Sequence, residues 1–150
     1  MKKIAFVCMG NTCRSPMLEC VFKHICKLEN NNNFKVVSYG LTAVDGENIS
    51  LNAKNILKKY KIKYTSHKAK KLTDKLLKKC DITLTVTEDI KNILKKYNNV
   101  YSIKEFIDGI DIPDPYGLSI NDYEVVFKVI YASAKKIYQK LQVEYEDSTM

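Results

Sequence analysis

Short runs of β-branched and aromatic residues alternate along the chain with segments whose apolar residues recur at helical spacing. The short runs predict four strands, at residues 3–8, 35–39, 81–86 and 99–103. The helical pattern covers residues 16–28, 50–60, 73–79 and 120–141. Strands that alternate with helices indicate an α/β fold, in which helices cover both faces of a parallel sheet.

The ends of the helices can also be predicted. Ser15 is a candidate N-cap of the first helix, and Pro16 suits the first helical position. The polar segment 28–33 predicts a loop, and residues 144–150 predict a frayed tail. The apolar pattern of the last helix, which begins at Ile120, is the clearest in the chain.

The composition suits one domain, residues 1–150, with an ordinary apolar fraction of 45%. The formal net charge of +8 favours acidic partners such as phosphorylated substrates. The lysines are spread along the predicted helices, which is typical of solvated faces. We therefore expect phosphorylated proteins as partners, with no nucleic acid and no membrane.

The five cysteines are an odd number, and the apolar run at the N-terminus is too short for a secretory signal. These features predict a cytoplasmic location with reduced thiols. No pair of Cys-x-x-Cys or His clusters indicates zinc, so we expect no metal. Cys20, Cys26 and Cys80 are predicted to be core thiols.

The segment VCMGNTCRSPM, residues 7–17, carries the candidate chemistry. Its Arg14 is the sole arginine among 25 basic side chains. A predicted strand ends at Cys8 and a predicted helix begins near residue 15, an arrangement that binds anions through loop N–H groups and the helix dipole. Gly10 and Asn11 tolerate the left-handed backbone of a tight loop. Arg14 adds a planar fork that can grip two phosphate oxygens, which lysine cannot do.

Cys8 would lie beneath the bound anion. The positive field that holds a phosphate also stabilises a thiolate, which is a nucleophile. Attack on a phosphate monoester would give a phosphocysteine that water then hydrolyses. Ser15 could donate a hydrogen bond to the sulfur.

The leaving oxygen needs a proton, so a carboxylic acid on a loop is expected. Residues 105–117 form the longest irregular stretch of the predicted fold and contain Asp108, Asp111 and Asp114. Asp114 lies between two prolines, which stiffen the backbone that carries it. An Asp-Pro pair by itself more often marks only a turn.

VCMGNTCRSPM near the N-terminus, together with DPYG at residues 114–117, resembles the low-molecular-weight protein tyrosine phosphatase family. The resemblance covers nearly the whole chain. It implies a three-layer fold, with a four-stranded parallel sheet, helices on both faces and a phosphate-binding loop after the first strand. It also implies no metal and no cofactor. Cys8 would be the nucleophile, Arg14 the phosphate clamp, and Asp114 the general acid and then the general base.

The same matching assigns supporting roles. Asn11 would hold the loop shape, Ser15 would bond the thiolate, and His67 would support that serine. Cys13 matches a second loop cysteine that can form a disulfide with the nucleophile, although a small loop residue is an equally good interpretation. The expected phosphate-binding and substrate-binding residues are Met9, Gly10, Asn11, Thr12, Cys13, Arg14, Ser15 and Tyr116.

The substrate is less defined by the sequence. Thr12 stands where many tyrosine-specific members have isoleucine, and it resembles bacterial members that act on phosphoarginine in proteins. Tyr116, in contrast, could stack on a phosphotyrosine ring. We take phosphotyrosine as the first expectation and phosphoarginine as the alternative.

Two weaker alternatives stay open. An arsenate reductase shares the fold and the cysteine loop but needs further cysteines after the third strand. Thr87 stands there instead, and Cys80 precedes the strand. A non-catalytic phosphoprotein-binding module would need neither Cys8 nor Asp114. A monomer is expected in every case.

Overall fold

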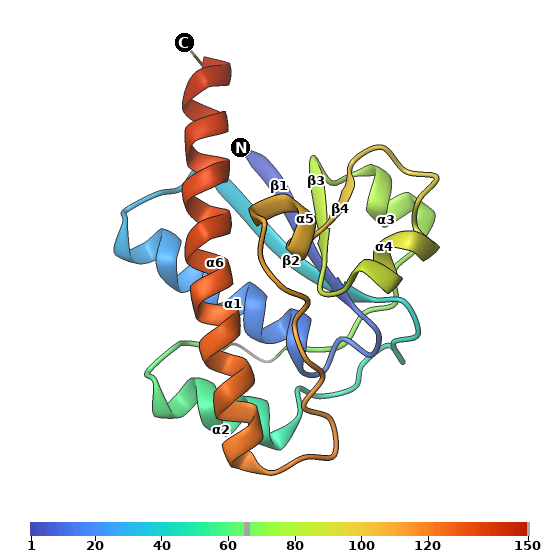
Figure 1. The fold of residues 1–150 in the computed structure, drawn as a ribbon, viewed down its shortest axis with the longest axis vertical. Helices are drawn as coiled ribbons and strands as arrows, with labels where there is room; N and C mark the ends of the chain where they lie inside the picture. The colour runs from blue at the N-terminus through green and yellow to red at the C-terminus, as the bar shows by residue number, and fades with distance from the viewer. Residues whose placement is uncertain (65–66, 150) are drawn as a thin grey trace.

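The computed structural model describes residues 1–64 and 67–149. Its centre is a sheet of four parallel strands in the order β2-β1-β3-β4 (Figure 1). The strands are β1 (Lys2–Cys8), β2 (Phe34–Gly40), β3 (Ile82–Thr85) and β4 (Val100–Ser102). The predicted α/β fold with a four-stranded parallel sheet is thus confirmed.

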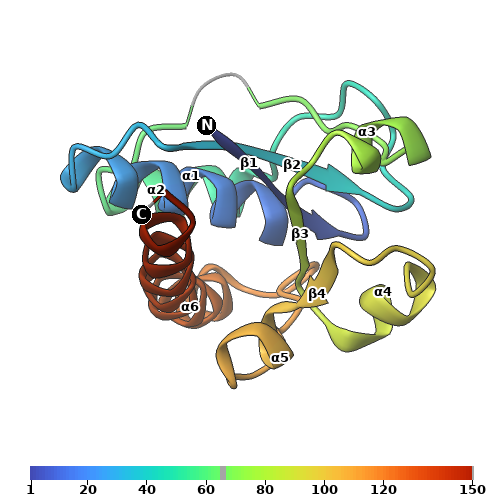
Figure 2. The same ribbon diagram turned by 90° about the horizontal axis from the view of Figure 1, so that it is seen from above.

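Six helices are found in the described residues. They are α1 (Arg14–Leu28), α2 (Leu51–Lys59), α3 (Asp74–Lys78), α4 (Glu88–Ile93), α5 (Ile103–Ile107) and α6 (Ile120–Thr149). Figure 2 shows α1 and α6 packed together on one face of the sheet, while α3 lies toward the other face. The sheet is therefore the middle layer of three.

Strand β1 is the buried centre of the sheet because it pairs with β2 on one side and β3 on the other. Its residues Ile4 to Val7 are completely buried, as expected for an apolar run covered on both faces. The Phe22 ring of α1 lies 5.8 Å from Phe6 and 5.9 Å from Tyr138 of α6. These contacts fix α1 between the sheet and α6.

The predicted start of the first helix was wrong by one to two residues. The helix begins at Arg14, Cys13 occupies the N-cap position, and no side chain in the described part of the chain caps it. Ser15 lies inside the first turn, where its hydroxyl bonds the side chains of Cys8 and Asn11. The uncapped first-turn N–H groups remain available to a ligand.

The C-terminal segment is also different from the prediction. Residues 144–149 continue α6 as helix instead of fraying, since Tyr145 packs against Phe34 with ring centroids 5.8 Å apart. The predicted irregular stretch 105–117 begins inside a helix, α5, which a capping box between Ser102 and Glu105 stabilises. Helices α4 and α5 were not predicted, and Ile103, the first residue of α5, was assigned to the strand predicted at residues 99–103.

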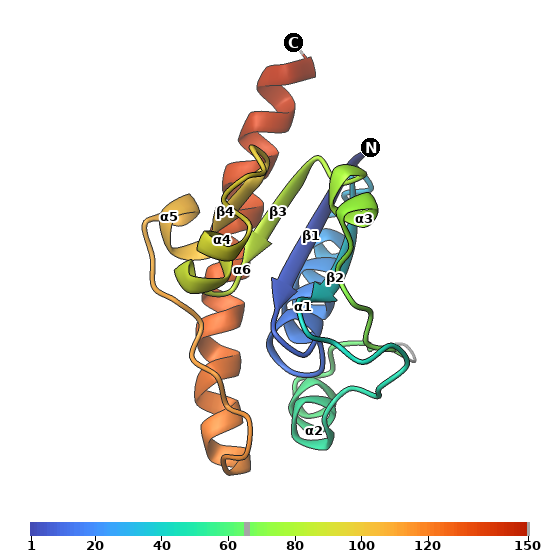
Figure 3. The same ribbon diagram turned by 90° about the vertical axis from the view of Figure 1, so that its right-hand side faces the viewer.

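All four strands point toward one end of the molecule, and the functional loops lie there. Figure 3 shows β1 running into a loop that turns back into α1. Backbone bonds join this loop to the segment after β2, with Thr42 N donating to Met9 O at 2.9 Å and Ser50 N to Thr12 O at 2.9 Å. Across residues 1–64 and 67–149, no helix has both the length and the apolar character needed to cross a membrane.

Candidate active site

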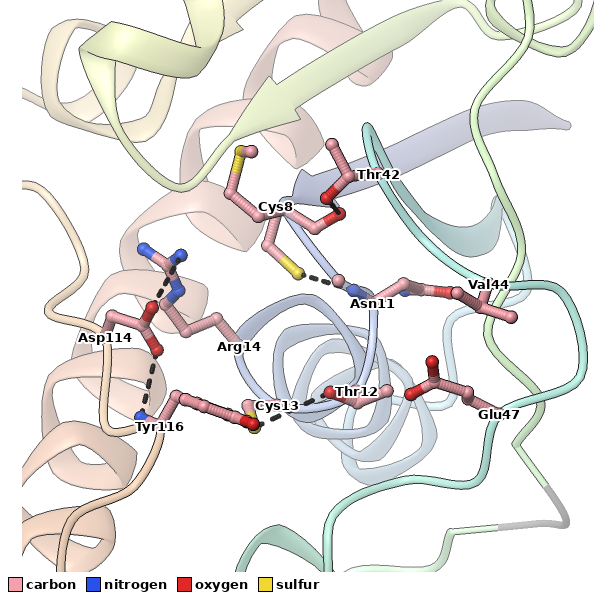
Figure 4. A pocket seen from close by; sticks show the side chains of 12 residues that line it. Cys8, Asn11, Thr12, Cys13, Arg14, Thr42, Val44, Glu47, Asp114 and Tyr116 are labelled. Atoms are coloured by element: carbon pink, nitrogen blue, oxygen red, sulfur yellow. Dashed lines mark hydrogen bonds and ion pairs between the residues drawn. The ribbon is translucent and has the colours of Figure 1, made fainter.

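Residues 8–15, which we call the anion loop, lie beneath a pocket of about 270 Å³, and residues 8–14 form its floor (Figure 4). The segment after β2 supplies one wall, and the loop between α5 and α6 supplies the other. The pocket is lined by Cys8, Met9, Gly10, Asn11, Thr12, Cys13, Arg14, Thr42, Val44, Glu47, Asp114 and Tyr116. Segments from three distant parts of the sequence therefore meet at the carboxyl ends of the strands.

Cys8 is the last residue of β1, and its side chain is almost completely buried beneath the loop. Its Sγ lies 2.9 Å from Ser15 Oγ and accepts a bond from Asn11 N at 3.2 Å. Asn11 Nδ2 donates to Ser15 Oγ at 2.8 Å, so the serine hydrogen can point at the Cys8 sulfur or at Tyr39 O, which is farther away at 3.5 Å. The Asn11 N–H therefore donates to the Cys8 sulfur, and the Ser15 hydroxyl is close enough to donate to it as well.

Asn11 organises the loop with each of its polar groups. Its carboxamide donates to Ser15 and to Ser38 Oγ at 3.0 Å, and its Oδ1 accepts from Lys70 N at 2.9 Å. Its backbone oxygen accepts a bond from His67 Nε2 at 2.8 Å. The residue is completely buried and has a φ of 57°. An asparagine tolerates this left-handed backbone while satisfying its buried polar atoms.

The predicted role of Gly10 was wrong. Asn11 carries the left-handed turn, and Gly10 does not have a positive φ. The glycine that the loop requires is Gly40 at the end of β2, where an added Cβ would lie 2.6 Å from Met9 O and 2.9 Å from Asn11 N. Gly40 therefore allows the backbone of β2 to approach the anion loop closely.

Arg14 is buried, and its guanidinium contacts the loop between α5 and α6. Nη1 donates to the carbonyl oxygen of Ile112 at 3.2 Å, and Nη2 lies 3.6 Å from Asp114 Oδ2. Asp114 Oδ1 accepts a bond from Tyr116 N at 3.0 Å, a local turn that orients the carboxylate. The two prolines around Asp114 restrict the same backbone. The Arg14 guanidinium and the Asp114 carboxylate thus lie next to each other at one side of the pocket.

The support that the resemblance implied His67 gives to Ser15 is indirect here and passes through Asn11, whose side chain bonds the serine. The ring bonds the backbone oxygen of Asn11, and because a carbonyl oxygen only accepts, Nε2 must carry the hydrogen. The serine is supported by Asn11, which is itself held by Ser38, and Ser38 Oγ donates to Glu19 Oε1 at 2.6 Å. A chain of hydrogen bonds therefore runs from Glu19 on α1 to the Cys8 sulfur.

Cys13 is buried at the N-terminal end of α1. Its Sγ lies 3.3 Å from the Tyr123 hydroxyl of α6. Burial and this thiol neighbour raise the pKa of Tyr123 to about 12, so the hydroxyl stays protonated at neutral pH. Cys13 and Cys8 both line the pocket and are both free thiols.

The structure brings the predicted residues of segment 8–14, Asp114 and Tyr116 around one pocket, with the buried Ser15 and His67 behind it. Tyr116 lines the rim but is 77% exposed, so it leaves the centre of the pocket open. Sequence reasoning missed Ser38, Glu19 and the wall formed by Thr42, Val44 and Glu47. Only Ser38 carried a signal, because it lies near the carboxyl end of a predicted strand.

Known proteins share this arrangement. The model of the family described as "Low molecular weight phosphotyrosine protein phosphatase" matches residues 3–147. The low molecular weight protein-tyrosine-phosphatase PtpB of Staphylococcus epidermidis is 34% identical over 140 residues, covering 90% of this chain and 96% of that protein. The protein-arginine-phosphatase of Bacillus subtilis is 35% identical over 128 residues, covering 81% and 84%. The crystal structure of a YwlE mutant from Bacillus subtilis superposes with a TM-score of 0.88 at 30% identity, covering 95% of this chain and 99% of that one.

Proposed function

The chain belongs to the low molecular weight phosphotyrosine protein phosphatase family, and from this premise we propose that it hydrolyses phosphotyrosine in proteins through a phosphocysteine at Cys8. The observation that carries the proposal is the position of the Cys8 sulfur. It accepts a hydrogen bond from Asn11 N and lies 2.9 Å from Ser15 Oγ at the floor of a pocket that Arg14 lines. A thiolate held in this way faces an anion bound in the loop.

The reaction takes two steps. Cys8 Sγ attacks the phosphorus, the bond from phosphorus to the tyrosyl oxygen breaks, and Asp114 gives that oxygen its proton. Water then attacks the phosphocysteine while Asp114 takes up a proton, the bond from phosphorus to sulfur breaks, and phosphate leaves. Arg14 and the uncapped N–H groups at the start of α1 stabilise the phosphoryl charge in both steps.

Substitution of the nucleophile tests this mechanism. Cys8→Ser is expected to abolish hydrolysis of a phosphotyrosine peptide while inorganic phosphate still binds, as measured by calorimetry. Cys80→Ser is the matched control, because its thiol donates to Leu76 O far from the pocket and a hydroxyl can do the same. Turnover that persists in Cys8→Ser would show that no phosphocysteine forms.

A second substrate, phosphoarginine in proteins, is favoured by one specific position. Thr12 lines the pocket, where its short side chain offers an aromatic ring less apolar surface than an isoleucine would. The protein-arginine-phosphatase of Bacillus subtilis is among the similar proteins. Paired kinetics of the wild type and Thr12→Ile on a phosphotyrosine peptide and a phosphoarginine protein decide between the substrates. A preference for phosphoarginine that Thr12→Ile reverses would make Thr12 the selector.

The arsenate reductase alternative loses support from the fold. Thr87, at the carboxyl end of β3, caps α4 by accepting a bond from Ile90 N. Cys80 lies at the amino end of β3, whereas the pocket lies at the carboxyl ends of the strands. No thiol is therefore placed to relay electrons from Cys8 along this strand.

We also propose that Cys13 protects the nucleophile. Peroxide would convert the Cys8 thiolate to a sulfenic acid, and the Cys13 thiol would displace water from it to form a disulfide that a reductant reopens. Peroxide followed by dithiothreitol should restore activity in the wild type but not in Cys13→Ser. Equal recovery in both proteins would leave Cys13 only a packing role. A monomeric state and a cytoplasmic location stay predictions.

A further inference from the structure

The pocket wall formed by the segment after β2 carries a carboxylate that the mechanism does not use. Glu47 lines the pocket and lies next to Thr12, on the other side of the anion loop from Asp114 (Figure 4). Of the lining residues, Arg14 is the one cation, and the bound phosphoryl group would occupy its fork. The space beyond the phosphoryl group therefore faces negative charge.

The backbone of Glu47 is fixed relative to the anion loop. Its carbonyl oxygen accepts a bond from Ala69 N at 2.8 Å, and its N–H donates to Val44 O at 3.2 Å. The segment is joined to the anion loop before and after this point, through Thr42 and Ser50. The Glu47 carboxylate can therefore move only by rotation about its own side-chain bonds, and it stays at the pocket rim.

Glu47 is also without a cationic partner, although the chain has 25 basic and 17 acidic residues. In the ranges 1–64 and 67–149, no lysine or arginine forms an ion pair with it. A free carboxylate at the mouth of a phosphate pocket repels a plain phosphate dianion, so the rest of the substrate must compensate.

We propose that Glu47 selects substrates that carry a positive charge beside the phosphoryl group. This inference rests on the proposed function and concerns the same pocket. The substrate feature that Glu47 would recognise is a cation within reach of the pocket rim. It could come from the guanidinium of phosphoarginine or from a lysine or arginine that flanks phosphotyrosine. Because Glu47 is exposed, the selection should be modest, about three- to tenfold in kcat/KM at low ionic strength.

The test compares Glu47→Gln with wild type on three substrates. These are a phosphoarginine protein, a phosphotyrosine peptide with flanking lysines and the same peptide with flanking glutamines. Glu47→Gln should lower kcat/KM for one or both cationic substrates about three- to tenfold, and should not lower it for the neutral peptide, from whose phosphate a repelling carboxylate has been removed. The cationic substrate that loses more identifies the source of the charge. Glu144→Gln, with the same change of charge on the exposed end of α6, should alter none of them.

Two results would overturn the inference. Glu47→Gln could change the neutral and cationic substrates equally, which would indicate a structural role, or change none of them. Failure of the proposed function has a different signature, since the wild type would then hydrolyse none of the three substrates. Raising the salt concentration should also erase the difference between the variants on cationic substrates.

Discussion

Nη2 of Arg14 lies 3.6 Å from Oδ2 of Asp114, and the two side chains differ greatly in exposure, 7% for the arginine and 54% for the aspartate. The clamp is therefore fixed in the protein while the acid is open to solvent. A phosphoryl group entering the pocket would take the free N–H groups of Arg14. The Asp114 carboxyl would then face the leaving oxygen.

The first prediction concerns this acid. Asp114→Asn should lower kcat for a phosphotyrosine peptide by about 10²- to 10⁴-fold, because an amide cannot supply or accept the proton. Inorganic phosphate should bind at least as tightly as in the wild type, since a carboxylate next to Arg14 has been removed. Steady-state kinetics and phosphate inhibition measure the two effects.

The control for this variant is Asp108→Asn. Asp108 is an exposed residue of the same stretch, with a φ of 52° that asparagine also tolerates. The Asp108→Asn variant should retain full activity. If both variants lost activity to the same extent, the loop and not the Asp114 carboxyl would be responsible.

The second prediction separates geometry from charge at the clamp. Arg14→Lys keeps the positive charge but cannot both bond Ile112 O and grip two phosphate oxygens. The loss of one hydrogen bond to a charged group should reduce kcat/KM by about 10- to 100-fold. Circular dichroism should show an unchanged fold. Wild-type kinetics in Arg14→Lys would mean that only charge matters at this site.

The third prediction concerns the hydrogen-bond chain behind the nucleophile. Ser38→Ala removes the acceptor of an Asn11 hydrogen bond and the donor of a bond to Glu19. Asn11 is buried and Glu19 is partly buried, so both would lose a partner inside the protein. We expect the free energy of unfolding to fall by about 1–3 kcal/mol and kcat to fall with it, because Asn11 also orients Ser15. Urea unfolding and kinetics measure the two effects.

Ser133→Ala is the matched control for Ser38→Ala. Both serines are 6% exposed, but Ser133 lies on α6 away from the anion loop. Ser133→Ala should leave kcat unchanged. A Ser38→Ala protein with normal kcat would show that the chain to Glu19 does not position Ser15.

The strands and long helices could be predicted from the sequence because each buries a periodic apolar face. The four strands were located within one or two residues. The start of α1 could not be predicted, since Ser15 satisfies the local rule for a cap but bonds Cys8 and Asn11 in the folded protein. Tertiary bonding outweighed a local preference at the site itself.

The candidate site could be predicted where its residues form one contiguous motif. Cys8 and Arg14 belong to a single strand–loop–helix unit, so their proximity follows from local geometry. Glu47 reaches the pocket, and Ser38 reaches the hydrogen bonds behind it, only through the pairing of β2 with β1 and the loop that follows β2. No local pattern marks Glu47, and Ser38 is marked only by its place near the carboxyl end of a predicted strand, because their positions depend on contacts between distant segments.

The fourth prediction distinguishes two glycines near the anion loop. Gly40→Ala should reduce stability by about 1–3 kcal/mol and lower activity, since the new Cβ would lie 2.6 Å from Met9 O. Gly10→Ala should change stability by less than about 1 kcal/mol, because the nearest atom is Thr12 Oγ1 at 3.8 Å. Thermal unfolding of both variants measures the contrast. The opposite order would show that Gly10 is the conformationally required glycine.

The last prediction concerns the thiols outside the pocket. Burial raises the pKa of Cys20 to about 12 and that of Cys26 to about 11, so both are protonated in the folded protein at neutral pH. Iodoacetamide should therefore leave them unlabelled in the native state, as measured by mass spectrometry, and should label them after unfolding in urea.

The same shifts make stability depend on pH. An unfolded cysteine ionises near pH 8.5, so above that pH the unfolded state loses protons that the folded state keeps. The contribution of these two thiols to stability should thus be constant below about pH 8 and should fall as the pH rises toward the folded pKa values of about 11 and 12. In the double variant Cys20→Ala, Cys26→Ala, the fall between about pH 8 and pH 10 should be smaller. An equal fall in both proteins would mean that other groups, such as Tyr123, cause the alkaline destabilisation.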